Sequence, residues 1–336
     1  MIRLLIPPDF EEVGRSVAAS EDALLIGSRG GAYAFHRVDG AWSIFPSRLE
    51  GPPQDLAFGR AVAIDNGTAV VAGGGGVAHV FEYVGIGRWR RAASLACPRM
   101  PAACASFGDS VAIHGRTAAV ALPGVAVYVF EKVADQWRLR DTLPAADIVS
   151  LSATATVTAS VDGAAVHRGA RYPLYTRASA FDGGIVFGNG SAAGVLRDGE
   201  VAPLFAEEDR PGFFFGDAVA GRGGVILVGA PRDSLRGYAV GAVYVFPSRR
   251  RVDAPVGGVS GFGSAVAVSG DGYFVVGAAS GGAFRGRVSQ EEEGAAAVRA
   301  AERDDNGRVL YGSIALAVIV ALMLCLLGRR CPRKRQ

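Results

Sequence analysis

The feature of this sequence that most restricts its fold is a repeated order of short apolar segments. The clearest copy reads Phe-Gly-Asp-Ala-Val-Ala at 215–220, Val-Ile-Leu-Val-Gly-Ala-Pro at 225–231 and Gly-Ala-Val-Tyr-Val-Phe at 241–246. Each apolar run is short, rich in β-branched and aromatic residues, and bounded by Gly, Pro or Asp, which is typical of a β-strand. Because no helical segment lies between the runs, they predict an antiparallel meander.

The same order recurs along the chain. Strong copies begin at Phe58, Phe107 and Phe262, and a weaker copy begins at Val13. Where two recognisable copies adjoin, they start about 48 residues apart, which is the period expected when each repeat supplies a four-stranded blade to a β-propeller. The sequence therefore predicts an all-β fold of radially arranged sheets.

The repeated motifs resemble the FG-GAP repeat, which builds the seven-bladed propeller of integrin α-subunits. The resemblance lies in Phe-Gly at the start of a copy, Val-Gly-Ala-Pro after the second strand and Val-Tyr-Val-Phe in the third, and it covers residues 1–288. It implies a seven-bladed β-propeller domain over those residues. A six-bladed ring is the alternative, because 145–209 lacks the landmarks and holds either two degenerate blades, near 148–176 and 177–206, or one overlong blade.

The N-terminal residues are predicted to close the ring. The copy that begins at Phe262 supplies strands near 262–268, 273–277 and 283–288, and is one strand short. Pairing of residues 2–6 with this copy would remove two exposed sheet edges, and integrin-type propellers close in a similar way. In the first blade, residues 42–45 are expected to form the outer strand.

The C-terminal part predicts a membrane anchor. Residues 289–308 are rich in Ala and charged residues and are expected to form a stalk. Residues 310–327 carry no charge, and 309–328 is long enough to cross a bilayer as a single transmembrane helix; a buried core helix is the alternative. Residues 329–336 form a short basic tail.

Two lines of sequence evidence on membrane orientation disagree. The basic tail favours a cytoplasmic C-terminus and an extracytoplasmic propeller. Asn66 and Asn189 lie in glycosylation sequons, and Cys97 and Cys104 are spaced to form a small disulfide loop, although free thiols are the alternative. Against this, residues 1–6 are too short for a secretory signal, which favours a tail-anchored protein facing the cytosol. Cys331, beside the basic residues, is a candidate palmitoylation site.

The sequence offers little catalytic chemistry. The four histidines are scattered over different copies, and no hydrolase or phosphate-binding motif is present. The resemblance suggests Ca²⁺ in the turn between the first two strands of a blade, but the turns at 65–67, 114–116, 221–224 and 269–272 lack the three carboxylates that such a site needs. We therefore expect no enzyme activity, no metal and no other cofactor.

Because no catalysis is expected, we expect the protein to bind a protein ligand. The loop at 232–238 is the richest candidate surface, with Arg232, Asp233, Arg236 and Tyr238 as its binding residues. Five basic residues lie in the last eight, so the rest of the chain is slightly acidic and nucleic acid is not expected as a partner. The leading hypothesis is a membrane-anchored, integrin-α-like propeller for cell-surface adhesion or receptor binding. The alternative is a tail-anchored, cytosol-facing scaffold, and a propeller hydrolase ranks third.

Overall fold

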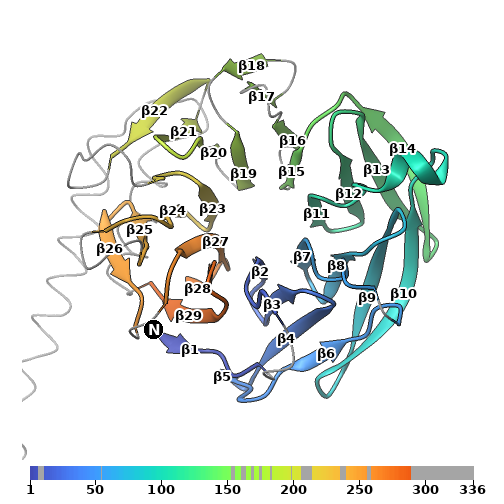
Figure 1. Cartoon of the computed structure of the whole chain (residues 1–336), viewed down its shortest axis with the longest axis horizontal. Helices are drawn as coiled ribbons and strands as arrows, with labels where there is room; N and C mark the ends of the chain where they lie inside the picture. Colours follow the sequence, from blue (N-terminus) through green and yellow to red (C-terminus); the bar gives the residue numbers. More distant parts are fainter. Residues whose placement is uncertain are drawn as a thin grey trace, which may run out of the picture.

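The fold is an all-β propeller. A computed structural model describes residues 1–288 except 7–10, 54, 153–155, 160–163, 168–169, 174–175, 182–183, 198, 206–213, 235–239 and 256–258. The described strands form seven sheets, which are arranged radially around one axis (Figure 1). Within each sheet, neighbouring strands pair antiparallel and follow one another from the axis outward.

The first three sheets are made of consecutive segments. The first contains β2 (Ser16–Ala19), β3 (Ala23–Ser28), β4 (Gly31–Val38), β5 (Ala41–Trp42) and β6 (Ser47–Leu49). The second contains β7 (Val62–Asp65), β8 (Thr68–Ala72), β9 (Val77–Gly85) and β10 (Arg88–Ala96). A short 3₁₀ helix, η1 (Pro101–Cys104), leads to the third, with β11 (Val111–His114), β12 (Thr117–Leu122), β13 (Ala126–Val133) and β14 (Gln136–Leu143).

The remaining sheets complete the ring. The fourth contains β15 (Ile148–Leu151), β16 (Thr156–Ala159), β17 (Ala164–His167) and β18 (Ala170–Pro173). The fifth contains β19 (Arg177–Phe181), β20 (Gly184–Gly188), β21 (Ala193–Arg197) and β22 (Glu200–Leu204). The sixth contains β23 (Ala218–Arg222), β24 (Val225–Ala230), β25 (Ala242–Phe246) and β26 (Arg250–Asp253). The seventh contains β27 (Phe262–Val268), β28 (Tyr273–Ala278), β29 (Ala283–Arg287) and, at its edge, β1 (Ile2–Arg3).

The repeated Phe-Gly motif sits at the contact between neighbouring sheets. Gly263 has a φ of 93°, a left-handed conformation that favours glycine, and a side chain there would crowd the carbonyl oxygen of Ala242. A Cβ atom on Gly229, the glycine of Val-Gly-Ala-Pro in the preceding sheet, would overlap the carbonyl oxygen of Gly263. The Phe-Gly glycine of one repeat therefore packs directly on the Gly-Ala-Pro glycine of the repeat before it.

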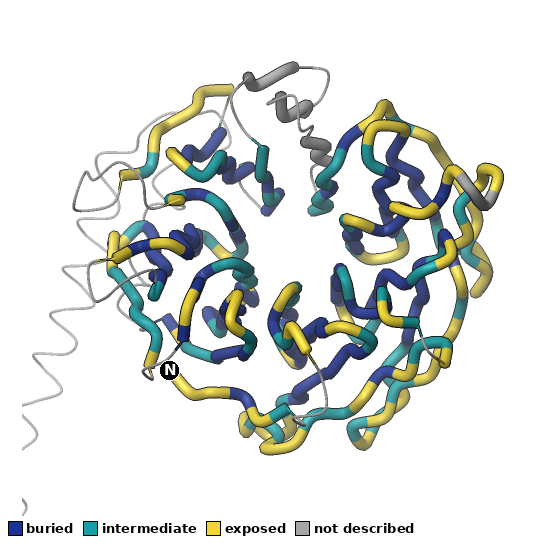
Figure 2. The backbone as a smooth tube through the Cα atoms, in the orientation of Figure 1, coloured by how far each residue is buried: buried dark blue, intermediate teal, exposed yellow. Residues whose placement is uncertain are grey.

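The hydrophobic core is divided among the spaces between neighbouring sheets. In the sheets other than the fourth, buried residues are concentrated in the middle and exposed residues lie toward the outer strands (Figure 2). One cluster joins the second and third sheets and includes Phe107 and Val120, both fully buried. The phenylalanines of three Phe-Gly pairs, Phe58, Phe107 and Phe262, are all fully buried. The aromatic part of the motif therefore anchors each repeat in the core shared with its neighbour.

The predicted ring closure is confirmed. β1 pairs antiparallel with β29, with Ile2 opposite Arg285 and Arg3 opposite Phe284. The pairing continues through a hydrogen bond of 2.9 Å from the Leu4 backbone N–H to the carbonyl of Ala283. The strand itself is shorter than the predicted residues 2–6.

The predicted outer strand of the first sheet is wrong in its extent. Residues 42–45 do not form one strand: β5 ends at Trp42, and β6 supplies a second outer segment that also pairs with β4. Ile44 and Phe45 lie between these strands and are 70% and 75% exposed. The aromatic and branched side chains that suggested a strand are therefore at the surface.

The predicted membrane span is not part of the described structure. Residues 309–328, the stalk at 289–308 and the tail at 329–336 all lie outside the described residues. Within the described part of the chain, no helix has the length and apolar character needed to cross a bilayer.

Leu4 and its neighbour Leu5 allow a direct test of ring closure. Leu4 is 8% exposed and packs with Leu24, Ile26 and Val275, whereas Leu5 is 59% exposed. We expect Leu4→Ala to lower the free energy of unfolding by about 2–4 kcal/mol, because it leaves a cavity in a buried cluster. Leu5→Ala is expected to change it by less than about 0.5 kcal/mol. Equal effects in urea denaturation would show that the N-terminal segment does not seal the ring.

Candidate functional site

The two ends of the ring carry different connections. Because consecutive strands run antiparallel, the turns from first to second strand and from third to fourth strand lie at one end, here called the turn face. The connections from second to third strand, and those between sheets, lie at the other end, the loop face. The turns at 20–22 and 66–67 are on the turn face, and the loop at 232–238 is on the loop face.

A narrow channel of about 240 Å³ runs between the innermost strands. Its wall is made mainly of small apolar residues and backbone from β2, β7, β11, β15, β19, β23 and β27. Ser150 and Ser179 add polar atoms, but these are used between sheets: the Ser150 hydroxyl accepts from the Ala180 N–H at 2.8 Å, and Ser179 accepts from Gly221 at 3.4 Å. The channel wall therefore uses its serines to connect sheets.

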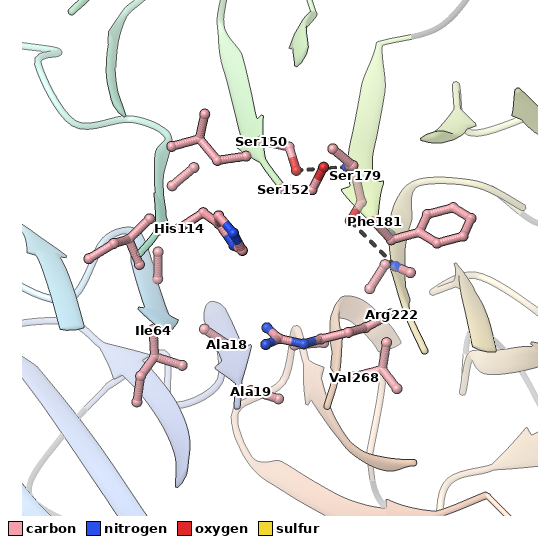
Figure 3. A pocket seen from close by; sticks show the side chains of 18 of the residues that line it. Ala18, Ala19, Ile64, His114, Ser150, Ser152, Ser179, Phe181, Arg222 and Val268 are labelled. Atoms are coloured by element: carbon pink, nitrogen blue, oxygen red, sulfur yellow. Dashed lines mark hydrogen bonds between the residues drawn. The ribbon is translucent and has the colours of Figure 1, made fainter. Parts of the chain in front are cut away.

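Arg222 extends into the channel at the turn face, and His114 extends into it from a different side (Figure 3). The Arg222 guanidinium lies 3.2 Å from the Glu21 carboxylate and 3.3 Å from the Asp65 carboxylate, which belong to the first and second sheets. Asp65 is buried, and it also accepts a hydrogen bond of 2.8 Å from the Gly115 N–H. One arginine thus connects three sheets, and its charge is balanced within the ring.

A larger hollow lies on the turn face between the first two sheets. This pocket has a volume of about 670 Å³ and is lined by residues of β3, β4, β8, β9 and β10, by the turns at 20–22 and 66–67, and by Lys132 of β13. Its size falls within the range of small-molecule sites in proteins. We call it the turn-face pocket.

Three aromatic rings form one wall of the turn-face pocket. His36 stacks on Tyr83 with 4.5 Å between ring centroids, and Trp89 lies 5.6 Å from His36 and 5.5 Å from Tyr83. The indole N–H of Trp89 donates to Nε2 of His36 at 3.0 Å, so Nε2 is the unprotonated nitrogen of the neutral imidazole. Tyr83 in turn accepts from the Gly87 N–H at 3.0 Å, which fixes the position of its hydroxyl.

Burial lowers the pKa of His36, because the imidazolium is poorly solvated there. Protonation would also remove the acceptor that Trp89 uses. His36 is therefore held neutral at pH 7, and its role is to keep the aromatic wall in one arrangement.

The cations that line the turn-face pocket already have anionic partners. Lys132 lies 2.7 Å from Glu82 and 3.3 Å from Asp135, and Arg37 pairs with Asp271 of the seventh sheet. The Lys132 ammonium lowers the pKa of the Glu82 carboxyl through a direct hydrogen bond. Excess positive charge in the pocket is thus largely neutralised.

The predicted ligand loop at 232–238 is only partly described. Arg232 is exposed, and its guanidinium lies 4.2 Å from the centre of the Phe214 ring. Asp233 is instead fully buried, and its carboxylate accepts from the Tyr244 hydroxyl and from Arg251, both at 2.8 Å. The position of Asp233 indicates a structural role in the sixth sheet, contrary to the predicted binding role. Arg236 and Tyr238 lie outside the described residues.

The predicted modification sites lie at turns and connections. Asn66 is exposed and sits in the turn between β7 and β8, where its φ is 42° and that of Gly67 is 71°. Asn189 follows β20, and its side-chain oxygen accepts from the N–H groups of Ser191 and Ala192. Glycosylation at both sites stays a prediction. Cys331 is outside the described residues.

Cys97 and Cys104 are joined by a disulfide at the loop face. The bridge closes the connection between the second and third sheets, and the Cys97 N–H donates to the carbonyl of Gly76 at 2.8 Å. The loop that leads into the third sheet is thereby tied to the second.

The described residues include no group of three or more His, Cys, Asp or Glu that could hold a metal ion. Of the four turns in which the family resemblance suggested calcium, those carrying Asp65, His114 and Arg222 meet around the channel mouth. There the Arg222 guanidinium occupies the position next to the Asp65 carboxylate, so the donor set is used for an ion pair between sheets.

Comparison with known proteins agrees with the repeat and the architecture. Residues 199–246 match the family model of the FG-GAP repeat. The chain carries an FG-GAP repeat. The matched segment includes β22 (Glu200–Leu204), β23, β24 and β25, and so covers most of the sixth sheet of the propeller. No curated protein is similar to the chain in sequence.

Solved structures share the fold at low sequence identity. The WD40 β-propeller domain of Doa1 is 12% identical, with a TM-score of 0.59 and coverage of 87% of this chain and 98% of that one. The computationally designed Ika8 protein is 13% identical, with a TM-score of 0.54 and coverage of 86% and 100%. PorZ, a surface component of the type-IX secretion system of Porphyromonas gingivalis, is 10% identical, with a TM-score of 0.52 and coverage of 86% and 39%. These likenesses establish the propeller fold alone.

The turn-face pocket was not predicted from the sequence. Its walls come from β4, from β9 and β10, and from the turns at 20–22 and 66–67, which are far apart along the chain. The only sequence signal was that aromatic residues, Tyr83 and Trp89, flank a glycine-containing turn on an outer hairpin. Outer strands usually face solvent, so this pattern did not by itself indicate a pocket.

The lowered pKa of His36 predicts a pH-dependent stability. The unfolded chain takes up a proton near pH 6.5, whereas folded His36 takes it up only at lower pH, so the free energy of unfolding falls as pH drops below about 6.5. His79, whose pKa burial also lowers, contributes in the same direction. His36→Gln can keep an acceptor for Trp89 but cannot titrate. Between pH 7.5 and pH 5, the free energy of unfolding of this variant should therefore fall by less than that of the unchanged chain. Urea denaturation at several pH values measures this, and identical pH profiles for the two proteins would contradict it.

Proposed function

We propose that this chain is a non-catalytic, protein-binding propeller, anchored in a membrane by residues 309–328, that serves in cell-surface adhesion or receptor binding. The observation that carries the proposal is a group of exposed apolar residues on the turn face. Val38 is 59% exposed at the end of β4, and Val84 and Ile86 are 55% and 97% exposed at the turn between β9 and β10. Contiguous exposed apolar surface is a mark of protein–protein contact sites, and we propose that these three residues form one such surface.

These residues belong to the same two sheets as the turn-face pocket. Val38 lines the pocket, and Val84 and Ile86 lie on the hairpin that presents Tyr83 and Trp89. An apolar rim beside a hollow with aromatic walls resembles the anchors of protein interfaces, where Tyr and Trp contribute much of the binding energy. We call Val38, Val84 and Ile86 the apolar rim.

We also propose that the ring has seven blades. The support for this count is that residues 145–209, which a six-bladed ring would use as one overlong blade, contain two four-stranded sheets, β15–β18 and β19–β22. Each of these has its own innermost strand at the channel. We therefore count them as two blades.

The membrane part of the proposal rests on the sequence after the propeller. Residues 310–327 carry no charge and are followed at once by a basic cluster, which favours a cytoplasmic tail. The exposed position of Asn66 and the Cys97–Cys104 bridge support an extracytoplasmic propeller, because glycosylation and disulfides belong to that side.

A substitution in the apolar rim tests the binding surface. Ile86→Asp places a charge on the most exposed rim residue, and burial of an isoleucine side chain is worth about 1.5–3 kcal/mol. We expect it to reduce partner capture about tenfold or more, measured by chemical crosslinking and quantitative mass spectrometry on cells that express the full chain. Leu139→Asp is the control, because Leu139 is 44% exposed on β14, outside the rim and the pocket. Equal crosslinking by both variants and the unchanged chain would rule out this surface.

A topology experiment tests the orientation. The full chain is expressed in glycosylating cells, and its electrophoretic mobility is compared before and after N-glycosidase treatment and in Asn66→Gln and Asn189→Gln variants. An extracytoplasmic propeller predicts a mobility shift that each substitution reduces, together with a C-terminal tail protected from protease outside the cell. Unmodified asparagines with an N-terminus that becomes accessible only after plasma-membrane permeabilisation would instead support the cytosol-facing scaffold.

A further inference from the structure

The turn-face pocket has polar groups that the fold does not use. Asp22, Asn66 and Thr68 line the pocket, and within the described residues none of their side chains is hydrogen-bonded. The charge of Asp22 is partly offset by its electrostatic interaction with Arg37. Asp22 and Asn66 are exposed, and Thr68 is partly so. Together they offer a carboxylate acceptor, an amide that both donates and accepts, and a hydroxyl that does both.

The remaining charged groups of the pocket are committed elsewhere. Glu82 pairs with Lys132, Arg37 pairs with Asp271, and Glu21 lies 3.2 Å from Arg222. A strongly charged ligand would have to compete with these pairs, whereas a neutral one would not. The uncommitted groups therefore suit a neutral ligand rich in hydroxyls.

The aromatic wall suits the apolar face of such a ligand. Tyr83 and Trp89 border the pocket, and their relative position is fixed by the hydrogen bond from Trp89 to His36 and the stacking of His36 on Tyr83. The negative face of an aromatic ring attracts positively polarised groups, such as the C–H bonds on one side of a sugar ring. Hydroxyls at the sugar edge would then reach the carboxylate, amide and hydroxyl opposite.

We propose that the turn-face pocket binds a short neutral saccharide, with Asp22, Asn66 and Thr68 hydrogen-bonded to its hydroxyls and Trp89 and Tyr83 against its ring. The volume of about 670 Å³ accommodates a ligand of one or two sugar rings. This goes beyond the proposed protein binding, which uses the apolar rim. Two sources can supply such a saccharide: a glycan on a partner, or the glycan predicted on Asn66, in which case the Asn66 amide is its attachment point and Asp22 and Thr68 make the hydrogen bonds.

The test follows the indole N–H signals of the tryptophans by NMR. The full chain is produced without glycosylation in detergent, labelled with ¹⁵N-tryptophan and titrated with lactose, maltose and N,N′-diacetylchitobiose. We expect at least one disaccharide to shift the Trp89 signal in a saturable way, while Trp42 and Trp137, outside the pocket, stay in place. The proposal is overturned if no disaccharide moves the Trp89 signal, or if only N-acetylarginine amide, a cationic probe, moves it.

Matched variants test the polar contacts. Asp22→Ala and Thr68→Val should each weaken disaccharide binding about 3- to 10-fold, the effect of losing one hydrogen bond. Asp141→Ala and Thr142→Val make the same changes at exposed positions of β14 and should leave binding unchanged. Unaltered affinity in both pocket variants would overturn the assignment.

Glycosylated protein separates the two saccharide sources. If the Asn66 glycan fills the pocket, the Trp89 signal is already shifted before titration, and N-glycosidase restores both its position and its response to disaccharide. If a partner's glycan is the ligand, the glycosylated chain responds to added disaccharide directly. The crosslinking test depends on Ile86 and not on the pocket. A chain that fails to bind saccharide can therefore still bind a protein partner, and a chain with no protein partner can still bind saccharide.

Discussion

The contact between glycines of successive repeats is the constraint on which the ring depends. In three of the Phe-Gly pairs the glycine lies against a glycine of the preceding sheet so closely that a side chain on either partner would overlap backbone, whereas Gly108 lies against the Cβ of Ala72. This occurs at Gly229 and Gly263, and again at Gly27 and Gly59. Close packing of backbones near the axis lets the sheets fan outward, and the space so created is filled by the buried phenylalanines. The residues of the FG-GAP pattern are thus the ones that form the contact between neighbouring blades.

A second set of contacts ties the sheets together by charge. Arg222 connects the sixth sheet to the first and second across the channel, and Arg37 connects the first sheet to the turn between β27 and β28 of the seventh. Arg37 also lies 5.2 Å from the centre of the Tyr273 ring, at the same seam. These pairs are partly buried, so their net energy is smaller than their geometry suggests, because desolvation opposes the attraction. Their clearer effect is to fix how the sheets are oriented at the turn face.

The candidate site follows from this arrangement. Once the first two sheets are held at a fixed angle, the turn at 20–22 and the hairpin of β9 and β10 face each other across a hollow. Sequence reasoning instead selected the loop at 232–238, because arginine and tyrosine are common at interfaces. The sequence did not indicate that Asp233 would be buried against Tyr244 and Arg251, because these partners, on β25 and β26, reach Asp233 only when the strands of the sixth sheet pair.

The sequence by itself determined the repeat, the order of the inner three strands in the strong copies and the closing role of the N-terminal residues, because glycine positions and apolar runs act locally or between adjacent repeats. For the weak region at 145–209, where β15–β18 and β19–β22 lie, the sequence left two degenerate blades and one overlong blade as alternatives. Only the tertiary structure decided the split outer edge of the first sheet, the buried state of Asp233 and the turn-face pocket. The physical reason is that burial and pocket shape depend on which side chains meet across a curved ring, and residues such as Asp22, Asn66 and Trp89 carry no local signal that they will meet.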